Sequence, residues 1–148
     1  MEIERKFLVD NTAFPYKTYP FKELEQGYLN TDPVVRVRKE DDLYYLTYKG
    51  KGLLAREEYN LPLNKEAYEH LIKKADGNII SKIRYIIPYG KYTIELDEFK
   101  EPFAPLIMAE VEFESIEEAN AFISPEWFME DVTENKEYHN SNMSKKIF

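Results

Sequence analysis

Charged residues at every second position mark seven segments of this 148-residue chain as candidates for carrying chemistry. Residues i and i+2 of a β-strand point to the same face, so each set would lie on one side of a strand. The seven bases of this shared face are Lys6, Arg36, Arg38, Lys49, Arg56, Lys82 and Arg84. Its seven acids are Glu2, Glu4, Glu58, Glu95, Asp97, Glu110 and Glu112. The set is neutral, so the rest of the chain carries the whole net charge of −8.

These residue types favour phosphoryl chemistry assisted by a metal ion. Carboxylates brought together repel one another unless a cation lies between them, and sites built from oxygen alone select Mg²⁺ or Mn²⁺. Arg and Lys facing them would hold a polyanion, Arg by bidentate contacts to phosphate. The chain has no cysteine and two histidines, which excludes a thiolate zinc site and a cysteine nucleophile and leaves little room for a Ser-His-Asp triad.

Eight segments with period-two patterning, or compatible with it, are predicted to be strands that position these charges. They are Glu2–Val9, Gln26–Asn30, Val34–Lys39, Tyr44–Lys49, Arg56–Leu61, Ile80–Ile87, Tyr92–Phe99 and Ile107–Glu114. Short connections rich in turn residues imply antiparallel pairing. A half-solvated antiparallel sheet explains any single strand equally well. That explanation weakens when seven strands carry almost only charged residues at their polar positions.

Closing the eight strands into a barrel would line its interior with these charges, with acids on one wall and bases on the other. Unpaired buried charges are very costly, so water or a charged ligand would fill the interior. Asn64 is expected to cap a helix that runs to Ala75, and Ser115 with Glu118 to open one that runs to about Ile123. The last helix is expected over about 134–146. The predicted fold is α+β, an eight-stranded antiparallel barrel with a few flanking helices, in a single domain over residues 1–148.

The composition limits the classes of partner that the protein could bind. An acidic protein with a pI of about 4.9 is a poor candidate for non-specific binding to nucleic acid or anionic lipid. No apolar run approaches the roughly 20 residues of a membrane span, and the chain does not open on a signal peptide. We therefore expect a cytoplasmic protein with neither a nucleic-acid nor a membrane partner, and the oligomeric state stays open.

The charged motifs follow one another in a recognisable order. The first is Glu2-Ile3-Glu4-Arg5-Lys6, an E-x-E-x-K pattern. The others are Gln26-Gly27-Tyr28-Leu29, Val35-Arg36-Val37-Arg38, Leu46-Thr47-Tyr48-Lys49-Gly50, Arg56-Glu57-Glu58-Tyr59, Ser81-Lys82-Ile83-Arg84-Tyr85, Glu95-Leu96-Asp97-Glu98-Phe99, Ala109-Glu110-Val111-Glu112-Phe113, and Asp131-Val132-Thr133 with Tyr138-His139-Asn140. Over essentially the whole chain, this series resembles the CYTH superfamily, also called triphosphate tunnel metalloenzymes. The resemblance implies an eight-stranded tunnel that binds a triphosphate together with Mg²⁺ or Mn²⁺.

The site residues are assigned on these patterns and on the resemblance. The predicted metal ligands are Glu2, Glu4, Asp97, Glu110 and Glu112, and the alternative for them is salt bridges across the tunnel. The predicted substrate-binding residues are Lys6, Arg36, Arg38, Lys49, Arg56, Lys82 and Arg84. The predicted catalytic residues are Lys82, Tyr28 and Glu4. Whether Glu58 or Glu95 also ligates metal stays open, because Asn60 stands where many relatives carry a second acid after Glu58.

Tyr28 has two readings. If it points inward, it could hydrogen-bond Lys82 and position or protonate a leaving phosphate. The alternative is simple packing near a strand end.

The expected activity is hydrolysis of a triphosphate, with inorganic triphosphate favoured because the compact chain offers few residues for a base or thiazole pocket. A nucleoside or thiamine triphosphatase is an alternative. A CYTH-type adenylate cyclase is another, although members of that group carry residues upstream of E-x-E-x-K, and here the first strand begins at residue 2. The alternative outside enzymes is a module that binds triphosphate or polyphosphate without turnover.

Overall fold

The structure is a computed structural model that describes residues 1–12 and 14–148, and most of it is one antiparallel sheet. Its strands are β1 (Glu2–Val9), β2 (Phe21–Thr31), β3 (Val34–Glu40), β4 (Leu43–Lys49), β5 (Ala55–Arg56), β6 (Glu58–Leu63), β7 (Asp76–Tyr89), β8 (Tyr92–Phe99), β9 (Ile107–Glu112) and β10 (Phe128–Asp131). Its helices are α1 (Lys65–Ile72), α2 (Ile116–Ala121) and α3 (Asn140–Met143), with 3-10 turns at Tyr16–Thr18 and Lys136–Tyr138. In the described part of the chain, no helix is long and apolar enough to cross a membrane.

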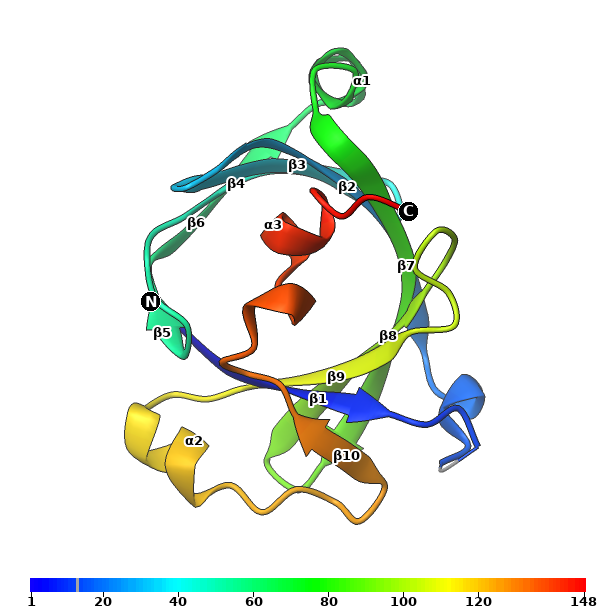
Figure 1. The fold of residues 1–148 in the computed structure, drawn as a ribbon, viewed down its shortest axis with the longest axis vertical. Coiled ribbons are helices and arrows are strands. Elements are labelled where there is room, and N and C mark those ends of the chain that lie inside the picture. Colours follow the sequence, from blue (N-terminus) through cyan, green and yellow to red (C-terminus); the bar gives the residue numbers. More distant parts are fainter. Residues whose placement is uncertain (13) are drawn as a thin grey trace.

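Eight strands curve into a barrel in the order β1-β9-β8-β7-β2-β3-β4-β6 (Figure 1). The ring is completed only by the short strand β5, where Arg56 pairs with Glu2 and Ala55 with Ile3. The sheet is therefore not a strictly closed ladder, but the predicted α+β class with an antiparallel tunnel is confirmed. The single strand predicted over Arg56–Leu61 is divided at Glu57 into β5 and β6. A further strand, β10, pairs with the outer edge of β1.

The predicted helix starts are confirmed, and one predicted helix is wrong. The Asn64 side chain accepts a hydrogen bond from the amide of Ala67, and the Ser115 side chain accepts one from the amide of Glu118. The helix predicted over 134–146 is replaced by the turn at Lys136–Tyr138 and by α3, because His139 between them has an extended backbone with ψ of 132°. The Asn135 side chain caps the turn at Lys136–Tyr138. The segment therefore forms two short elements in place of one long helix.

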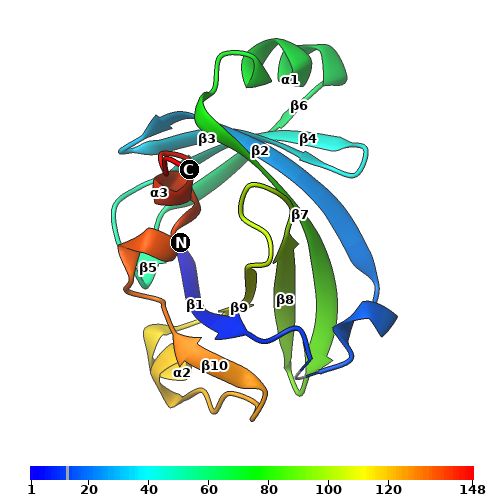
Figure 2. The same ribbon diagram turned by 45° about the vertical axis from the view of Figure 1, so that its right-hand side comes forward.

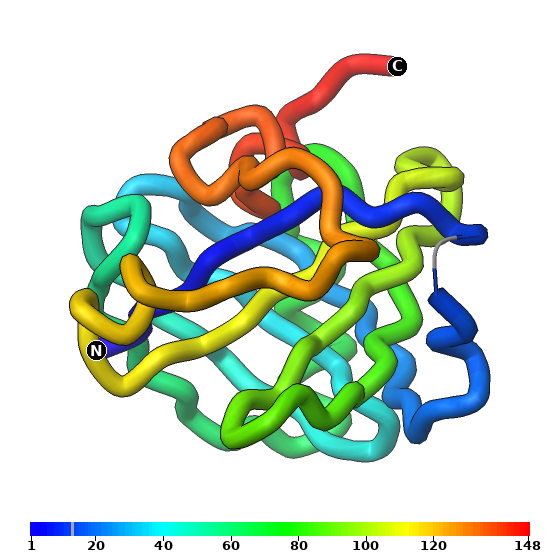
Figure 3. The backbone as a smooth tube through the Cα atoms, turned by 90° about the horizontal axis from the view of Figure 1, so that it is seen from below, coloured from blue at the N-terminus to red at the C-terminus, as the bar shows by residue number. Residues whose placement is uncertain are grey.

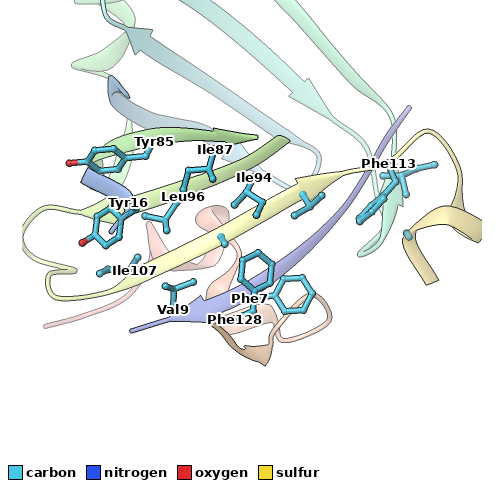
Figure 4. Close-up of a cluster of buried hydrophobic side chains, with 14 residues drawn as sticks. Phe7, Val9, Tyr16, Tyr85, Ile87, Ile94, Leu96, Ile107, Phe113 and Phe128 are labelled. Carbon is cyan, nitrogen blue, oxygen red and sulfur yellow. The ribbon is translucent and has the colours of Figure 1, made fainter. Parts of the chain in front are cut away.

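An apolar cluster covers the outer face of the strands that carry the acids (Figure 4). Alternation sends Phe7 of β1 and Val111 of β9 outward, while their charged neighbours point inward. The Phe7 ring packs on Phe128 of β10 with centroids 4.6 Å apart, and Tyr16 meets the edge of Tyr85. This packing under β10 and α2 holds the acid-bearing strands in place (Figure 2).

A second apolar cluster fills one end of the barrel interior. Ile80, Phe99 and Met108 lie two residues from Lys82, Asp97 and Glu110 and share their face. The C-terminal segment of residues 132–148 adds Val132 and Met143 to this cluster. Figures 1 and 3 show the same segment passing over one opening of the barrel. The interior is thus apolar at one end and charged along the rest.

Candidate active site

The inward faces of the strands enclose a polar cavity of about 320 Å³. All the shared-face charges predicted from the sequence line it except Lys82 and Asp97. The cavity is also lined by Tyr28, Glu40, Tyr45, Thr47, Asn60 and Asn140. Arg36 and Arg84 are 5% and 6% exposed, so both lie in the interior as the tunnel interpretation requires. Lys49 is buried as well.

Asp97 and Lys82 lie behind the cavity wall and are completely buried. Arg84 Nε and Nη2 donate to the two oxygens of Asp97 at 2.7 and 2.8 Å, and Lys82 Nζ lies 2.7 Å from Asp97 Oδ2. Burial favours the neutral carboxyl, but Arg84 and Lys82 outweigh it and hold the pKa of Asp97 below its usual value. Asp97, predicted as a metal ligand, has both oxygens engaged by these cations. Through these contacts, Asp97 fixes the positions of the Arg84 and Lys82 side chains.

Asp97→Asn should therefore destabilise the fold strongly. The substitution removes the carboxylate that pairs with Lys82 and takes two hydrogen bonds from Arg84, and breaking a buried ion pair in this way costs roughly 3–5 kcal/mol. Urea unfolding should show a loss in this range for Asp97→Asn. Glu95→Gln is the matched control, since Glu95 also faces Arg84, at 3.3 Å, but its side chain is 34% exposed. Equal free energies of unfolding for the two variants would contradict this role of Asp97.

Four carboxylates on β1 and β9 form an acid wall, namely Glu2, Glu4, Glu110 and Glu112. In the β1–β9 register Glu4 is directly opposite Glu112, and Lys6 is opposite Glu110. Lys6 Nζ lies 3.9 Å from Glu4 and 3.7 Å from Glu110. Burial, followed by the charge of Glu110, raises the pKa of Glu4 to about 8. A cation placed beside Glu4 would favour its charged form and relieve the repulsion from Glu110.

Bases from β4 and β5 pair with Glu2, the first residue of the acid wall along β1. Lys49 Nζ lies 2.9 Å from Glu2 Oε1 and 3.3 Å from Glu58, and Arg56 Nε lies 3.7 Å from Glu2. Burial favours protonated Glu58, but its hydrogen bond with Glu2 and the charge of Lys49 outweigh burial and lower the Glu58 pKa to about 2. These pairs are the cross-tunnel salt bridges that the sequence left as an alternative to metal ligation.

The acid wall fits a hard divalent cation by its donor chemistry. Its ligand atoms would all be carboxylate oxygens, which suits Mg²⁺ or Mn²⁺. Within residues 1–12 and 14–148, no three Asp, Glu or His side chains converge on a common point suited to a metal. The observed contacts of Glu2 and Glu110 are instead with Lys49 and Lys6. A metal ion bound there would have to compete with these bases for the same oxygens.

The opposite wall concentrates guanidinium groups from β3 and β7. Burial, and then the charges of Arg36 and Arg84, lower the pKa of Arg38 to about 9. Arg36 Nε is buried and has no hydrogen-bond partner within the described residues. Arg38 Nε donates to Gln26 Oε1 at 2.8 Å. Cations held this close repel one another, and an anion carrying several charges would relieve the repulsion.

The predicted hydrogen bond between Tyr28 and Lys82 is not formed. Tyr28 does point into the cavity, but its hydroxyl accepts a 3.4 Å hydrogen bond from Gln26 Nε2. Lys82 Nζ instead lies 5.1 Å from the centre of the Phe99 ring, and burial above all lowers its pKa to about 8. The two groups are separated because Lys82 pairs in register with Leu24, four residues before Tyr28.

Sequence reasoning missed several neutral residues of the site. Gln26 is completely buried between Arg38 and Tyr28, and Thr47 donates a 2.6 Å hydrogen bond to Asn60 Oδ1. Gln26 shares a face with Tyr28 by the same i, i+2 rule, so its facing is encoded in the sequence although it carries no charge. Asn140 lies in the C-terminal segment, whose path across the barrel no periodicity encodes.

Comparisons with known proteins agree with this geometry. The family model of the CYTH domain matches residues 1–146. The chain belongs to the CYTH family. An inorganic triphosphatase of Nitrosomonas europaea is 40% identical over 99% of this chain and 98% of its own length. An inorganic triphosphatase of Acetivibrio thermocellus is 38% identical, with coverage of 99% and 95%.

A solved structure of a similar protein also superposes on the fold of this chain. A crystal structure of an inorganic triphosphatase superposes with a TM-score of 0.74 at 37% sequence identity, covering 99% of this chain and 96% of that one. The resemblance of the motifs to the CYTH superfamily is therefore confirmed by both sequence and structure.

Proposed function

We propose that this CYTH protein hydrolyses inorganic triphosphate to pyrophosphate and phosphate with the help of a divalent metal ion. The observation that carries the proposal is a cavity in which a carboxylate wall faces a guanidinium wall. Near full-length similarity to two inorganic triphosphatases supports it. The activity belongs in the cytoplasm, in keeping with a chain that has no cysteine.

The bases would bind the phosphoryl oxygens along the cavity. They come from five strands: Lys6 on β1, Arg36 and Arg38 on β3, Lys49 on β4, Arg56 on β5, and Arg84 on β7, with Lys82 of β7 behind the cavity wall. Side chains from so many strands can surround a chain of phosphates and neutralise the charge that develops as one phosphoryl group leaves. Arg is suited to bidentate contacts, and Lys acts as a point charge.

The acid wall of Glu2, Glu4, Glu110 and Glu112 would hold the metal. When bound there, a divalent ion supplies charge neutralisation and an activated water. Glu4 is central to this wall because it lies opposite Glu112 and feels the charge of Glu110. Its catalytic role is to keep the cation beside the phosphates. Asp97 contributes from behind by holding Arg84 and Lys82.

Lys82 is suited to deliver a proton to the departing phosphate. Its ammonium is completely buried, lies 2.7 Å from Asp97 Oδ2, and has a pKa of about 8, lowered chiefly by burial. Such a group is mostly protonated near neutral pH yet gives up its proton readily. Tyr28, held by Gln26, borders the same cavity and would position substrate.

Product analysis should show one phosphate and one pyrophosphate for each tripolyphosphate consumed in the presence of Mg²⁺ or Mn²⁺. Excess EDTA should stop the reaction, because the divalent ion is proposed to supply the activated water. Phosphorus NMR of the reaction mixture identifies both products directly. Tight binding of tripolyphosphate without any product would favour a binding module, and cyclic AMP formed from ATP would favour a cyclase.

A further inference from the structure

A neutral side chain, Asn140, lies in the wall of the charged cavity. The residue is 8% exposed, and its Oδ1 atom is buried without a hydrogen-bond partner in the described structure. The other buried side-chain atoms without a partner there are Arg36 Nε and Lys82 Nζ, which both belong to the proposed triphosphate site. Buried polar groups in folded proteins are normally hydrogen-bonded. Asn140 and Arg36 both line the cavity, so their unpartnered atoms indicate a polar ligand that contacts both of them.

Two anchors fix the position of Asn140. On one side His139 Nε2 lies 2.9 Å from the Thr133 carbonyl oxygen, and Thr133 Oγ1 accepts a 2.9 Å hydrogen bond from the Lys6 amide. The C-terminal segment is thereby tied to the strand that carries the acid wall.

On the other side, the Ser144 amide donates to the Asn140 carbonyl at 2.9 Å, and the Ser144 carbonyl accepts from the Asn78 amide of β7 at 2.6 Å. Gly77 makes this close approach possible, since a Cβ there would collide with the Ser144 carbonyl. Asn140 begins α3, which lies across the opening of the barrel (Figure 1). Its carboxamide is therefore presented to the cavity from a rigid support.

We propose that Asn140 contacts the phosphate chain directly, with its Nδ2 donating a hydrogen bond to a phosphoryl oxygen. The inference rests on the proposed triphosphatase function. Rotation of the carboxamide by 180° exchanges its oxygen and nitrogen within the same shape, so the donor reaches the buried side of the group. A neutral donor adds a contact without adding charge to the guanidinium wall, whose members already repel one another. Asn140 is thus a substrate-contacting residue supplied by the C-terminal segment.

Asn140→Asp tests this contact because it keeps the shape and replaces the donor with a negative charge. Ser141→Asp is the matched control, since it adds the same charge one residue along, at a position that borders a different, outer pocket. Binding of tripolyphosphate is measured by calorimetry in EDTA, where no turnover occurs. We expect at least ~30-fold weaker binding for Asn140→Asp, ~3- to 10-fold for Asn140→Ala, and less than ~3-fold for Ser141→Asp.

The same variants are assayed for kcat/KM with Mg²⁺ and for thermal stability. Asn140→Ser retains a hydroxyl donor, so it should bind tripolyphosphate more tightly than Asn140→Ala at equal melting temperature. This pair of variants tests the contact if Asn140→Asp fails to fold. Equal weakening by Asn140→Asp and Ser141→Asp, or unchanged binding in Asn140→Ala, would overturn the contact. If the wild type binds tripolyphosphate without hydrolysing it, the proposed function fails while the binding series still decides the role of Asn140. No binding to the wild type overturns both.

Discussion

Glu4→Gln should abolish metal-dependent hydrolysis of inorganic triphosphate, with a loss of at least ~1000-fold in kcat/KM. That factor corresponds to about 4 kcal/mol of transition-state stabilisation. The reason is that an amide has nearly the volume of a carboxylate but lacks the charge that holds a hard cation. Glu4 lies opposite Glu112 and feels the charge of Glu110, so its loss removes a carboxylate that is close to two others of the acid wall. Steady-state phosphate release at several Mg²⁺ concentrations measures the effect.

The fold should survive this substitution. Because the pKa of Glu4 is raised to about 8, burial first among the causes, the site already accommodates an uncharged side chain there at neutral pH. Glu110 is different, since its pKa is held well below the usual value by Lys6 and Arg84 in spite of burial. Glu4→Gln is therefore a cleaner test than Glu110→Gln. Glu114→Gln, at an exposed position just beyond β9, is the matched control and should keep full activity. Near-normal hydrolysis by Glu4→Gln would refute the metal assignment.

Arg36→Ala should cause a loss of similar size, also at least ~1000-fold in kcat/KM. Arg36 is buried in the middle of β3, opposite Tyr28 on β2 and Thr47 on β4, with its Nε unpartnered. Its guanidinium is thus available to the phosphate chain rather than committed to a carboxylate. Removing it takes a full charge and two donor atoms from the wall. The measurement is again kcat/KM for tripolyphosphate with saturating Mg²⁺.

Two further variants separate charge from geometry. Arg36→Lys keeps the charge but loses the planar fork, so we expect an intermediate loss of ~10- to 100-fold. Lys39→Ala, on the exposed face of the same strand, should change kcat/KM less than ~2-fold. If Arg36→Ala retained most of the activity, or Lys39→Ala lost as much, the triphosphate would have to bind elsewhere.

The strands and the facing of their charges were predictable because alternation is a local property. Glu2, Glu4 and Lys6 share a face whatever the rest of the chain does, and the structure brings them to one cavity. The N-caps Asn64 and Ser115 were equally local, since a short polar side chain before an apolar stripe is enough to define them.

The remaining features depend on long-range packing. The division of the predicted strand at Glu57 follows from its pairing with two different neighbours, β1 and β4. The path of residues 132–148 is set by contacts with Lys6 and Asn78, more than sixty positions away. Asp97 carried the right charge and facing, but only the register of β7 and β8, which sets Arg84 opposite Asp97, showed that it holds cations. The periodicity of a strand shows on which face a side chain lies, but it does not show which residue that side chain contacts.

The ratio of kcat/KM for tripolyphosphate to kcat/KM for ATP, measured side by side with Mg²⁺ and with Mn²⁺, tests the central claim most directly. The bases of the cavity bind phosphates from several strands, whereas specific recognition of adenine would need placed donors and acceptors for its edge. We expect a preference for tripolyphosphate of at least ~10-fold, equivalent to about 1.4 kcal/mol of transition-state binding. Faster hydrolysis of ATP than of tripolyphosphate, or formation of cyclic AMP from ATP, would contradict it.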